Sequence, residues 1–184
     1  MPKYVAFLRA INVGGRFVKM AVLAEHFHTL GYSAIQTHIN SGNVVFQASS
    51  RRPDALARTL QEGLAPLLGY MSEAFVRTVA EVHEIARRAQ SLADQEPSLK
   101  EVNVALLGAP LNTAQQAALQ ALQTDVDSFV PDGCEVYWLC RVKQSDSRFS
   151  NALFERKLKI RTTIRRVTML QGLSAALQNT TNDV

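Results

Sequence analysis

Apolar and polar residues along the first eighty positions follow two different periods. Four segments have the short apolar runs or the alternation typical of β-strands, and two carry apolar residues at helical spacing. The predicted strands are residues 3–10, 33–39, 44–46 and 75–79. The predicted helices are marked by Met20, Leu23, Phe27 and Leu30, ended by Gly31, and by Leu56, Leu60, Leu64 and Leu67, preceded by Pro53. Pro66 and Gly69 are expected to end or kink the second helix.

The order of these elements is strand, helix, strand, strand, helix, strand. Ser41-Gly42-Asn43 supplies turn residues, so the middle strands are predicted to form a hairpin, with Ile35, Thr37 and Ile39 on one face. This order is typical of a ferredoxin-like sandwich, a four-stranded antiparallel sheet with two helices on one face. We therefore predict an α+β fold with a ferredoxin-like subdomain (βαββαβ) over residues 1–80.

A third helix is predicted after the last of these strands. Thr78 and Glu81 have the spacing of a capping box, and apolar residues then recur at helical spacing up to Leu92. The polar, proline-bearing stretch 93–98 has the composition of a domain boundary. We expect a connecting helix and linker over residues 81–98 and a second, smaller α+β subdomain over residues 99–184.

The second half is predicted to begin with a strand at 102–106 and a helix opened by a Thr113/Gln116 capping box. Strands at 126–130 and 136–142 flank a turn at 131–133. A helix from Arg148 to Leu158 is expected to be capped by Asp146 or Ser147, residues 161–163 to be a connector, and a last helix to bury Leu170, Leu173 and Leu177. No internal repeat is visible in the sequence.

Composition indicates a globular protein without membrane segments. The 184 residues are 47% apolar and 20% charged, and no apolar run approaches the ~20 residues that span a bilayer. The first residues do not resemble a signal peptide, so we expect a cytoplasmic protein. Cys134 and Cys140 would lie about 20 Å apart on one strand, which predicts two unpaired thiols. No feature indicates an oligomeric state.

The net charge of +4 is concentrated in one segment. Residues 141–166 carry nine basic and two acidic side chains, and the rest of the chain is slightly acidic. A local basic segment is typical either of an anionic partner or of a solvated face.

Known catalytic and metal-binding patterns are absent. The four histidines are not spaced as metal ligands, and neither a paired Cys-x-x-Cys motif nor a Gly-x-Ser-x-Gly elbow occurs, so we expect no metal site and no cofactor. Hairpin chemistry explains Ser41 without a nucleophilic role. The RNP1 pattern of RNA-binding sheets is also missing, so Tyr4, Phe7 and Phe46 are interpreted as core residues.

Two segments have a composition suited to ligand binding. Gly14-Gly15 offers unhindered backbone N–H groups before a helix N-terminus and close to Arg9, Arg16 and Lys19, which suits an anion; a loop that only needs positive φ explains the glycines equally well. In the second half, Arg148, Asn151 and Glu155 are predicted to share a helical face beside Arg156 and Lys157, either as a ligand site or as an exposed ion-pair ladder.

The motifs resemble one bacterial family over nearly the whole chain. Leu8-Arg9-Ala10-Ile11-Asn12-Val13-Gly14-Gly15, Ser41-Gly42-Asn43-Val44-Val45-Phe46, Ser147-Arg148-Phe149-Ser150-Asn151-Ala152 and Glu155-Arg156-Lys157-Leu158 are similar to the domain of unknown function 1697 family. Ala10 stands where that family usually has glycine, and Arg165-Arg166-Val167 where it tends to have Arg-Asn-Trp. The resemblance implies a ferredoxin-like half followed by a second α+β half, and it implies no activity.

Three hypotheses for function follow. The first is a binding module for a phosphate-bearing ligand, a nucleotide or nucleic acid, whose candidate ligand-binding residues are Arg9, Asn12, Gly14, Gly15, Lys19, Ser41, Gly42, Asn43, Arg148, Asn151, Glu155 and Arg156. The second is an enzyme that acts on a small phosphorylated or carboxylated substrate between the subdomains. The third is an interaction or assembly protein with architectural glycines, which would expose a large apolar patch.

Overall fold

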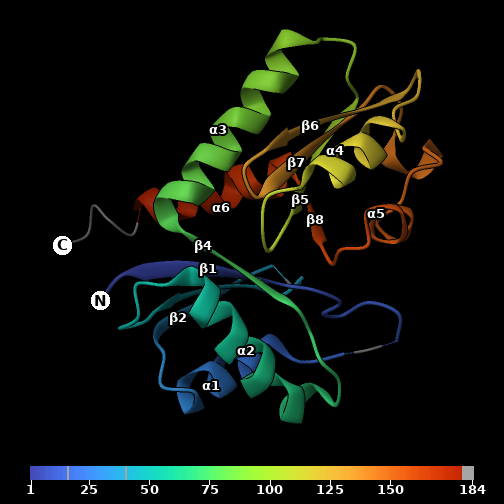
Figure 1. Ribbon diagram of the computed structural model, residues 1–184. Helices are drawn as coiled ribbons and strands as arrows, with labels where there is room; N and C mark the ends of the chain where they lie inside the picture. Colours follow the sequence, from blue (N-terminus) through green and yellow to red (C-terminus); the bar gives the residue numbers. More distant parts are fainter. Residues whose placement is uncertain (16, 40, 180–184) are drawn as a thin grey trace. The chain divides into compact units, whose positions relative to one another are not determined.

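The computed structural model describes residues 1–15, 17–39 and 41–179 (Figure 1). Arg16, one of the cations considered beside Gly14-Gly15, lies outside the described residues. The chain has a mixed α+β fold and divides into two compact units, Met1–Val82 and His83–Val184. No helix in the described part is both long and apolar enough to cross a membrane.

The N-terminal unit is built on one antiparallel sheet. Its elements in chain order are β1 (Lys3–Leu8), α1 (Met20–Thr29), β2 (Ser33–His38), β3 (Asn43–Gln47), α2 (Pro53–Leu68) and β4 (Ala74–Thr78). The strands lie in the order β2-β3-β1-β4, and every neighbouring pair is antiparallel. All the predicted elements of this half are therefore confirmed as helices and strands.

Alternation along the strands directs one set of side chains toward α1 and α2, which cover the same face of the sheet (Figure 1). Tyr4 and Phe46 lie in this core and are 2% and 0% exposed, as expected for residues that pack rather than bind RNA. Gly69, with φ +73°, caps α2, and Pro66 is accommodated inside that helix. Ile39 differs from the prediction: it follows β2 in a left-handed turn, with φ +51°, and is exposed.

The C-terminal unit contains a second sheet of the same size. Helix α3 (Val79–Gln95) follows β4 directly, and its predicted stripe from Val82 to Leu92 is buried. The next elements are β5 (Glu101–Leu106), α4 (Thr113–Gln120), β6 (Asp127–Asp132), β7 (Glu135–Cys140), the 3₁₀ turn η1 (Gln144–Asp146), α5 (Asn151–Leu158), β8 (Thr163–Arg166) and α6 (Val167–Asn179). The strand order is β6-β7-β5-β8, again antiparallel throughout.

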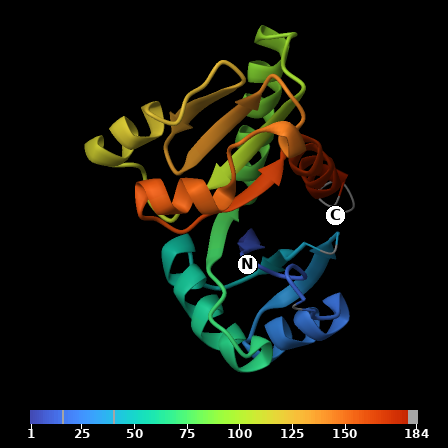
Figure 2. The same ribbon diagram turned by 90° about the vertical axis from the view of Figure 1, so that its right-hand side faces the viewer.

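Helices cover both faces of this second sheet. Helices α4 and α5 share the core that contains Trp138 and Phe154, while α6 packs on β5 and β8 on the other side (Figure 2). Helix α3 runs beside α6, and His83 Nδ1 lies 2.6 Å from Ser174 Oγ. The prediction of a smaller second subdomain is wrong, because this unit spans more residues than the first.

The two units repeat one topology, which the sequence did not reveal. Each reads strand, helix, strand, strand, helix, strand and is followed by a helix, α3 or α6, and each orders its strands second, third, first, fourth. Even one side chain is repeated: Arg77 and Arg165 are the last but one residues of β4 and β8, and each donates Nη1 to the carbonyl before it at 3.0 Å. The expectation of no internal repeat is therefore wrong at the level of the fold.

Four local predictions in the second half need correction. The capping box of α4 is formed by Asn112 and Gln115, one residue before the predicted pair, Thr113 and Gln116. The turn between β6 and β7 lies at Gly133-Cys134, so Pro131 belongs to β6, which tolerates it because an edge strand has N–H positions without partners.

The other two corrections concern the segment 145–166. Helix α5 begins at Asn151 with Ser150 as its N-cap, because Phe149 is drawn into the core against Trp138 and Phe129 and holds the preceding backbone out of the helix. The connector predicted at 161–163 runs into a strand, β8, which completes its sheet through pairing with β5.

Candidate functional site

Three loops of the N-terminal unit meet at one end of its sheet. They are the segment after β1, the β2–β3 hairpin and the connection from α2 to β4. Leu8 N donates to Gly42 O at 2.8 Å, and a Cβ on Gly42 would lie 2.9 Å from Ile11 Cβ. Gly42 therefore cannot carry a side chain, because the hairpin packs directly on the segment after β1. The Ser41-Gly42-Asn43 turn therefore lies against the first loop.

Side chains from the third loop hold the segment after β1 in place. Ser72 Oγ donates to Arg9 O at 2.6 Å, and Tyr70 Oη donates to Ala10 O at 2.9 Å. Arg9 N donates to Glu73 O at 2.8 Å, and the Arg9 guanidinium lies 3.5 Å from the Glu73 carboxylate. Arg9 thus contributes to the loop architecture through both its backbone and its charge.

Asn12 closes the glycine loop. Its Oδ1 accepts from Val18 N at 2.7 Å, and its Nδ2 donates to Val18 O at 3.2 Å. Asn12 itself has φ +55°, a left-handed conformation that asparagine tolerates better than most residues. The amide therefore ties the two ends of residues 12–18 together, which limits the positions that the loop between them can adopt.

The tip of this loop exposes backbone. Gly14 and Gly15 have φ of +62° and +81°, and no atom lies within 4 Å of the position that a Cβ would take on either. Among the described residues, none accepts a hydrogen bond from their N–H groups. The positive φ explains the choice of glycine, and the open N–H groups leave anion binding possible.

Helix α1 follows this tip without a side-chain cap. Its N-cap residue, Lys19, is exposed and makes no capping bond, and no acidic residue occupies the first turn. The positive end of the helix dipole and the Lys19 ammonium therefore add to the positive potential beside Gly14 and Gly15.

The other two candidate side chains of this unit support the hairpin. Asn43 is fully buried, and its Nδ2 donates to His38 O at 3.2 Å and to Ser41 Oγ at 2.8 Å. These contacts account for Ser41 and Asn43 as turn-stabilising residues.

The remaining candidates lie in the C-terminal unit and do not share one helical face. Arg148 is exposed and precedes α5, so its predicted alignment with Asn151 and Glu155 is wrong. Arg156 is exposed in the last turn of α5, where a cation complements the helix dipole.

Asn151 and Glu155 hold the segment that leads into β8. The Glu155 side chain is only 9% exposed and accepts from Thr162 N at 2.9 Å, while Arg161 Nη1 lies 3.4 Å from its second oxygen. Asn151 Nδ2 lies 3.5 Å from Glu155 Oε1 and 3.4 Å from Thr162 O. Glu155 therefore pairs with Arg161 and not with the arginines at 148 and 156 that the sequence places beside it.

Three residues near the N-terminal loops were not predicted. Tyr70 and Ser72 carry no sequence signal, since only the fold brings them to Arg9 and Ala10. Phe17 is 78% exposed between the glycines and Lys19, and an isolated aromatic residue in a polar, glycine-rich loop was a signal available in the sequence.

Neither cysteine forms a disulfide, and in the described part of the chain no three His, Cys, Asp or Glu side chains are grouped as metal ligands. Burial raises the pKa of the Cys140 thiol to about 12, which opposes the reactive thiolate form.

Comparisons with known proteins identify relatives without a described activity. A family model described as a protein of unknown function, DUF1697, matches residues 1–137. A solved structure of a conserved bacterial protein, SP0830 from Streptococcus pneumoniae, has a TM-score of 0.75 at 21% identity, covering 97% of this chain and 99% of the other. This likeness shows the fold. No curated protein matches.

Proposed function

Given that the chain belongs to the DUF1697 family of proteins of unknown function, we propose from its N-terminal loops that it is a binding module for a phosphate-bearing ligand, a nucleotide or single-stranded nucleic acid. The observation that carries the proposal is an exposed aromatic side chain, Phe17, beside open backbone N–H groups and a cation. A nucleotide offers a flat base and a phosphate, the two groups that this combination binds.

The phosphate is assigned to the tip of the loop. Glycines allow close approach of an anion, and a loop that leads into an uncapped helix N-terminus directs N–H groups toward it. Lys19 adds a charge at the same place. The Asn12 bonds to Val18 restrict the loop before binding, which reduces the entropy lost on complex formation.

The base is assigned to Phe17. A phenylalanine exposed by 78% gains little burial in the folded protein, and stacking of a base on its ring is worth about 1–3 kcal/mol. Val13 in the same loop and Ile39 in the β2–β3 hairpin are exposed by 55% each and offer further apolar surface.

The topology supports a ferredoxin-like assignment for the N-terminal unit as part of the same proposal. Its strand order β2-β3-β1-β4, its antiparallel pairing and the two helices on one face are those of a split βαβ sandwich. In this assignment the ligand is bound by loops at one end of the sheet, and the sheet aromatics remain in the core.

The test is fluorescence anisotropy of the full chain with a labelled twelve-nucleotide single strand and, separately, with a labelled mononucleotide. We expect Phe17→Ala to weaken binding about tenfold, a loss within the range of one stacked base. Met71→Ala is the matched control, since Met71 is an exposed apolar residue of the adjoining α2–β4 loop. Lys19→Gln should lower the slope of log affinity against log salt by about 0.7 for a single strand.

Binding of the oligonucleotide alone would assign a polymer, and binding of both would assign a nucleotide unit. The proposal is refuted if neither probe binds at 50 mM salt, or if Phe17→Ala and Met71→Ala lower the affinity equally.

A further inference from the structure

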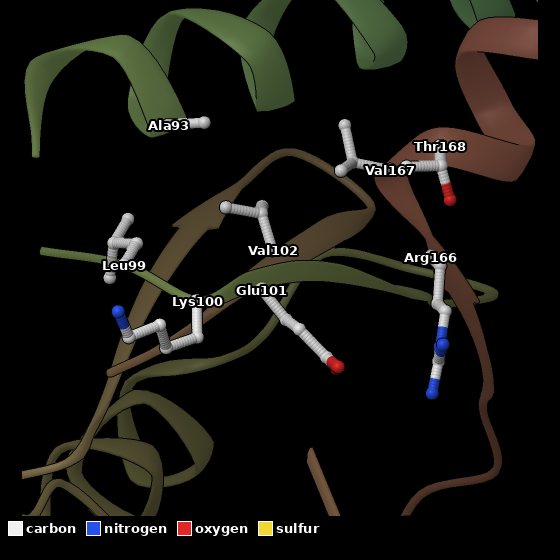
Figure 3. A pocket seen from close by; sticks show the side chains of 8 residues that line it. All are labelled: Ala93, Leu99, Lys100, Glu101, Val102, Arg166, Val167 and Thr168. Atoms are coloured by element: carbon white, nitrogen blue, oxygen red, sulfur yellow. The ribbon is translucent and has the colours of Figure 1, made fainter. Parts of the chain in front are cut away.

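A pocket of about 270 Å³ opens within the C-terminal unit, and its lining residues all belong to that unit (Figure 3). It lies between the C-terminal part of α3, the beginning of β5 and the junction of β8 with α6. Figure 3 shows Leu99, Val102 and Val167 on the side of the pocket near α3, Glu101 and Arg166 extending away from that side, and the Lys100 amino group beside Leu99. The pocket thus has an apolar wall and a charged rim.

The internal repeat shows how this junction differs from its counterpart. At the equivalent passage from β4 to α3 the helix N-terminus is capped by a capping box, in which Glu81 Oε2 accepts from Thr78 N at 2.7 Å and Thr78 Oγ1 accepts from Glu81 N at 3.2 Å. The equivalent positions at the β8–α6 junction are Arg166 and Met169. Neither side chain is a hydrogen-bond acceptor that can form such a box.

As a result, the N-terminus of α6 has no internal cap. Among the described residues, no side chain accepts a hydrogen bond from the first turn of this helix. The rim cations are equally available, since Lys100 and Arg166 are exposed and form no ion pair with a described residue.

One carboxylate also reaches the rim. Glu101 Oε2 accepts from Gln144 N at 3.3 Å, so part of its hydrogen-bonding capacity is used within the protein. Lys100 and Arg166 line the same pocket as this single carboxylate, and the helix dipole adds further positive potential. The rim therefore favours an anion.

We propose that this pocket binds a small organic anion whose apolar body contacts Leu99, Val102 and Val167 and whose anionic oxygens lie at Arg166 and Lys100. The volume is slightly below the usual range for ligand pockets, so it fits a compound of about one ring rather than a polymer. Carboxylates and phosphate monoesters share the required chemistry, an anionic oxygen pair on an apolar group. This site does not depend on the function proposed for the N-terminal loops.

The experiment is a titration of the ¹⁵N-labelled full chain, followed by two-dimensional NMR, with phenyl phosphate and with benzoate. We expect saturable shifts confined to the amides of residues 99–102 and 166–169. The relative affinity of the two probes then separates phosphate from carboxylate ligands. Benzyl alcohol, which lacks the charge, and inorganic phosphate, which lacks the apolar body, should each bind at least about tenfold more weakly than the better probe, because a charge-assisted hydrogen bond or a buried ring is lost.

Variants test the assigned residues. Arg166→Gln and Lys100→Gln should each weaken binding about tenfold, while Arg156→Gln, which removes an exposed arginine of α5, should leave it unchanged. The double change Arg166→Thr and Met169→Glu would transplant the capping box of α3, which removes the Arg166 cation and caps the N-terminus of α6, so binding should be lost. Phe17→Ala should have no effect on these titrations.

Shifts spread over other surfaces, no saturation with either probe, or equal behaviour of Arg166→Gln and Arg156→Gln would overturn the proposal. The chemical-shift dispersion of the same spectra verifies that the protein is folded in each of these titrations.

Discussion

Replacement of Ala10 by glycine tests whether the loop after β1 holds its backbone under strain. Ala10 has φ +57°, and its carbonyl is fixed by the Tyr70 hydroxyl at 2.9 Å, while Arg9 is held by Ser72 and Glu73. The resemblance to the family led us to expect glycine at this position. The left-handed conformation explains that preference, because a Cβ raises its energy and glycine has none.

The magnitude follows from two opposing terms. A left-handed conformation costs a non-glycine residue about 1–2 kcal/mol, which Ala10→Gly would recover. Glycine also raises the entropy of the unfolded chain, which lowers stability by about 0.4–1 kcal/mol. The expected net effect is a stabilisation of the N-terminal unit by about 0.5–1 kcal/mol.

Native-state hydrogen exchange is the suitable assay, because it reports on each unit separately. Amides of the β1–β3 ladder, such as Val5 and Val45, should exchange about two- to fivefold more slowly in Ala10→Gly. Ala21→Gly is the matched control: Ala21 is exposed in α1, where glycine has no conformational advantage, so those amides should exchange faster. Faster exchange in both variants would refute the reasoning that Ala10 is strained.

Two further predictions concern buried groups. Asn43→Ala removes donors to His38 O and Ser41 Oγ from a fully buried position, so thermal unfolding should show that the free energy of unfolding falls by about 1–3 kcal/mol. Ser41→Ala leaves Asn43 in place and should lower it by less. Equal losses in the two variants would contradict the assigned role of Asn43. Burial raises the pKa of Cys140 from its ordinary value of 9.0 to about 12, so the stability contributed by the protonated thiol is complete below pH 9 and is lost as the pH rises toward 12. In urea unfolding between pH 9 and 11, the free energy of unfolding should therefore fall with pH more steeply for the wild type than for Cys140→Ala, by up to about 1.4 kcal/mol per pH unit. Equal slopes would exclude the effect.

The site shows where sequence reasoning succeeds and where it does not. Gly14, Gly15 and Gly42 were identified because glycine marks unusual backbone, and all three have positive φ. Asn12 was selected as a ligand-binding candidate, yet its amide closes the loop on Val18. A sequence motif shows that a polar side chain has a specific place, but the hydrogen-bond partner that defines its role lies elsewhere in the chain.

The same distinction applies to Arg148 and to β8. A helical spacing of polar residues suggested that the helix begins at Arg148, but the core around Trp138 takes Phe149 and delays the helix to Asn151. Residues 163–166 contain two arginines and no apolar run, so nothing local predicts a strand. They form one because β5 offers a free edge to pair with.

The sequence by itself determined the α+β class, the positions of the elements in the N-terminal half and the loop glycines, because periodicity and backbone preference act over a few residues. Only the tertiary structure decided the repeat of one topology in two units, the Tyr70 and Ser72 contacts that hold the first loop, and the pocket at the β8–α6 junction. These features depend on contacts between residues far apart in the chain. Many different sequences can pack in the same way, so such contacts leave no local pattern in the sequence.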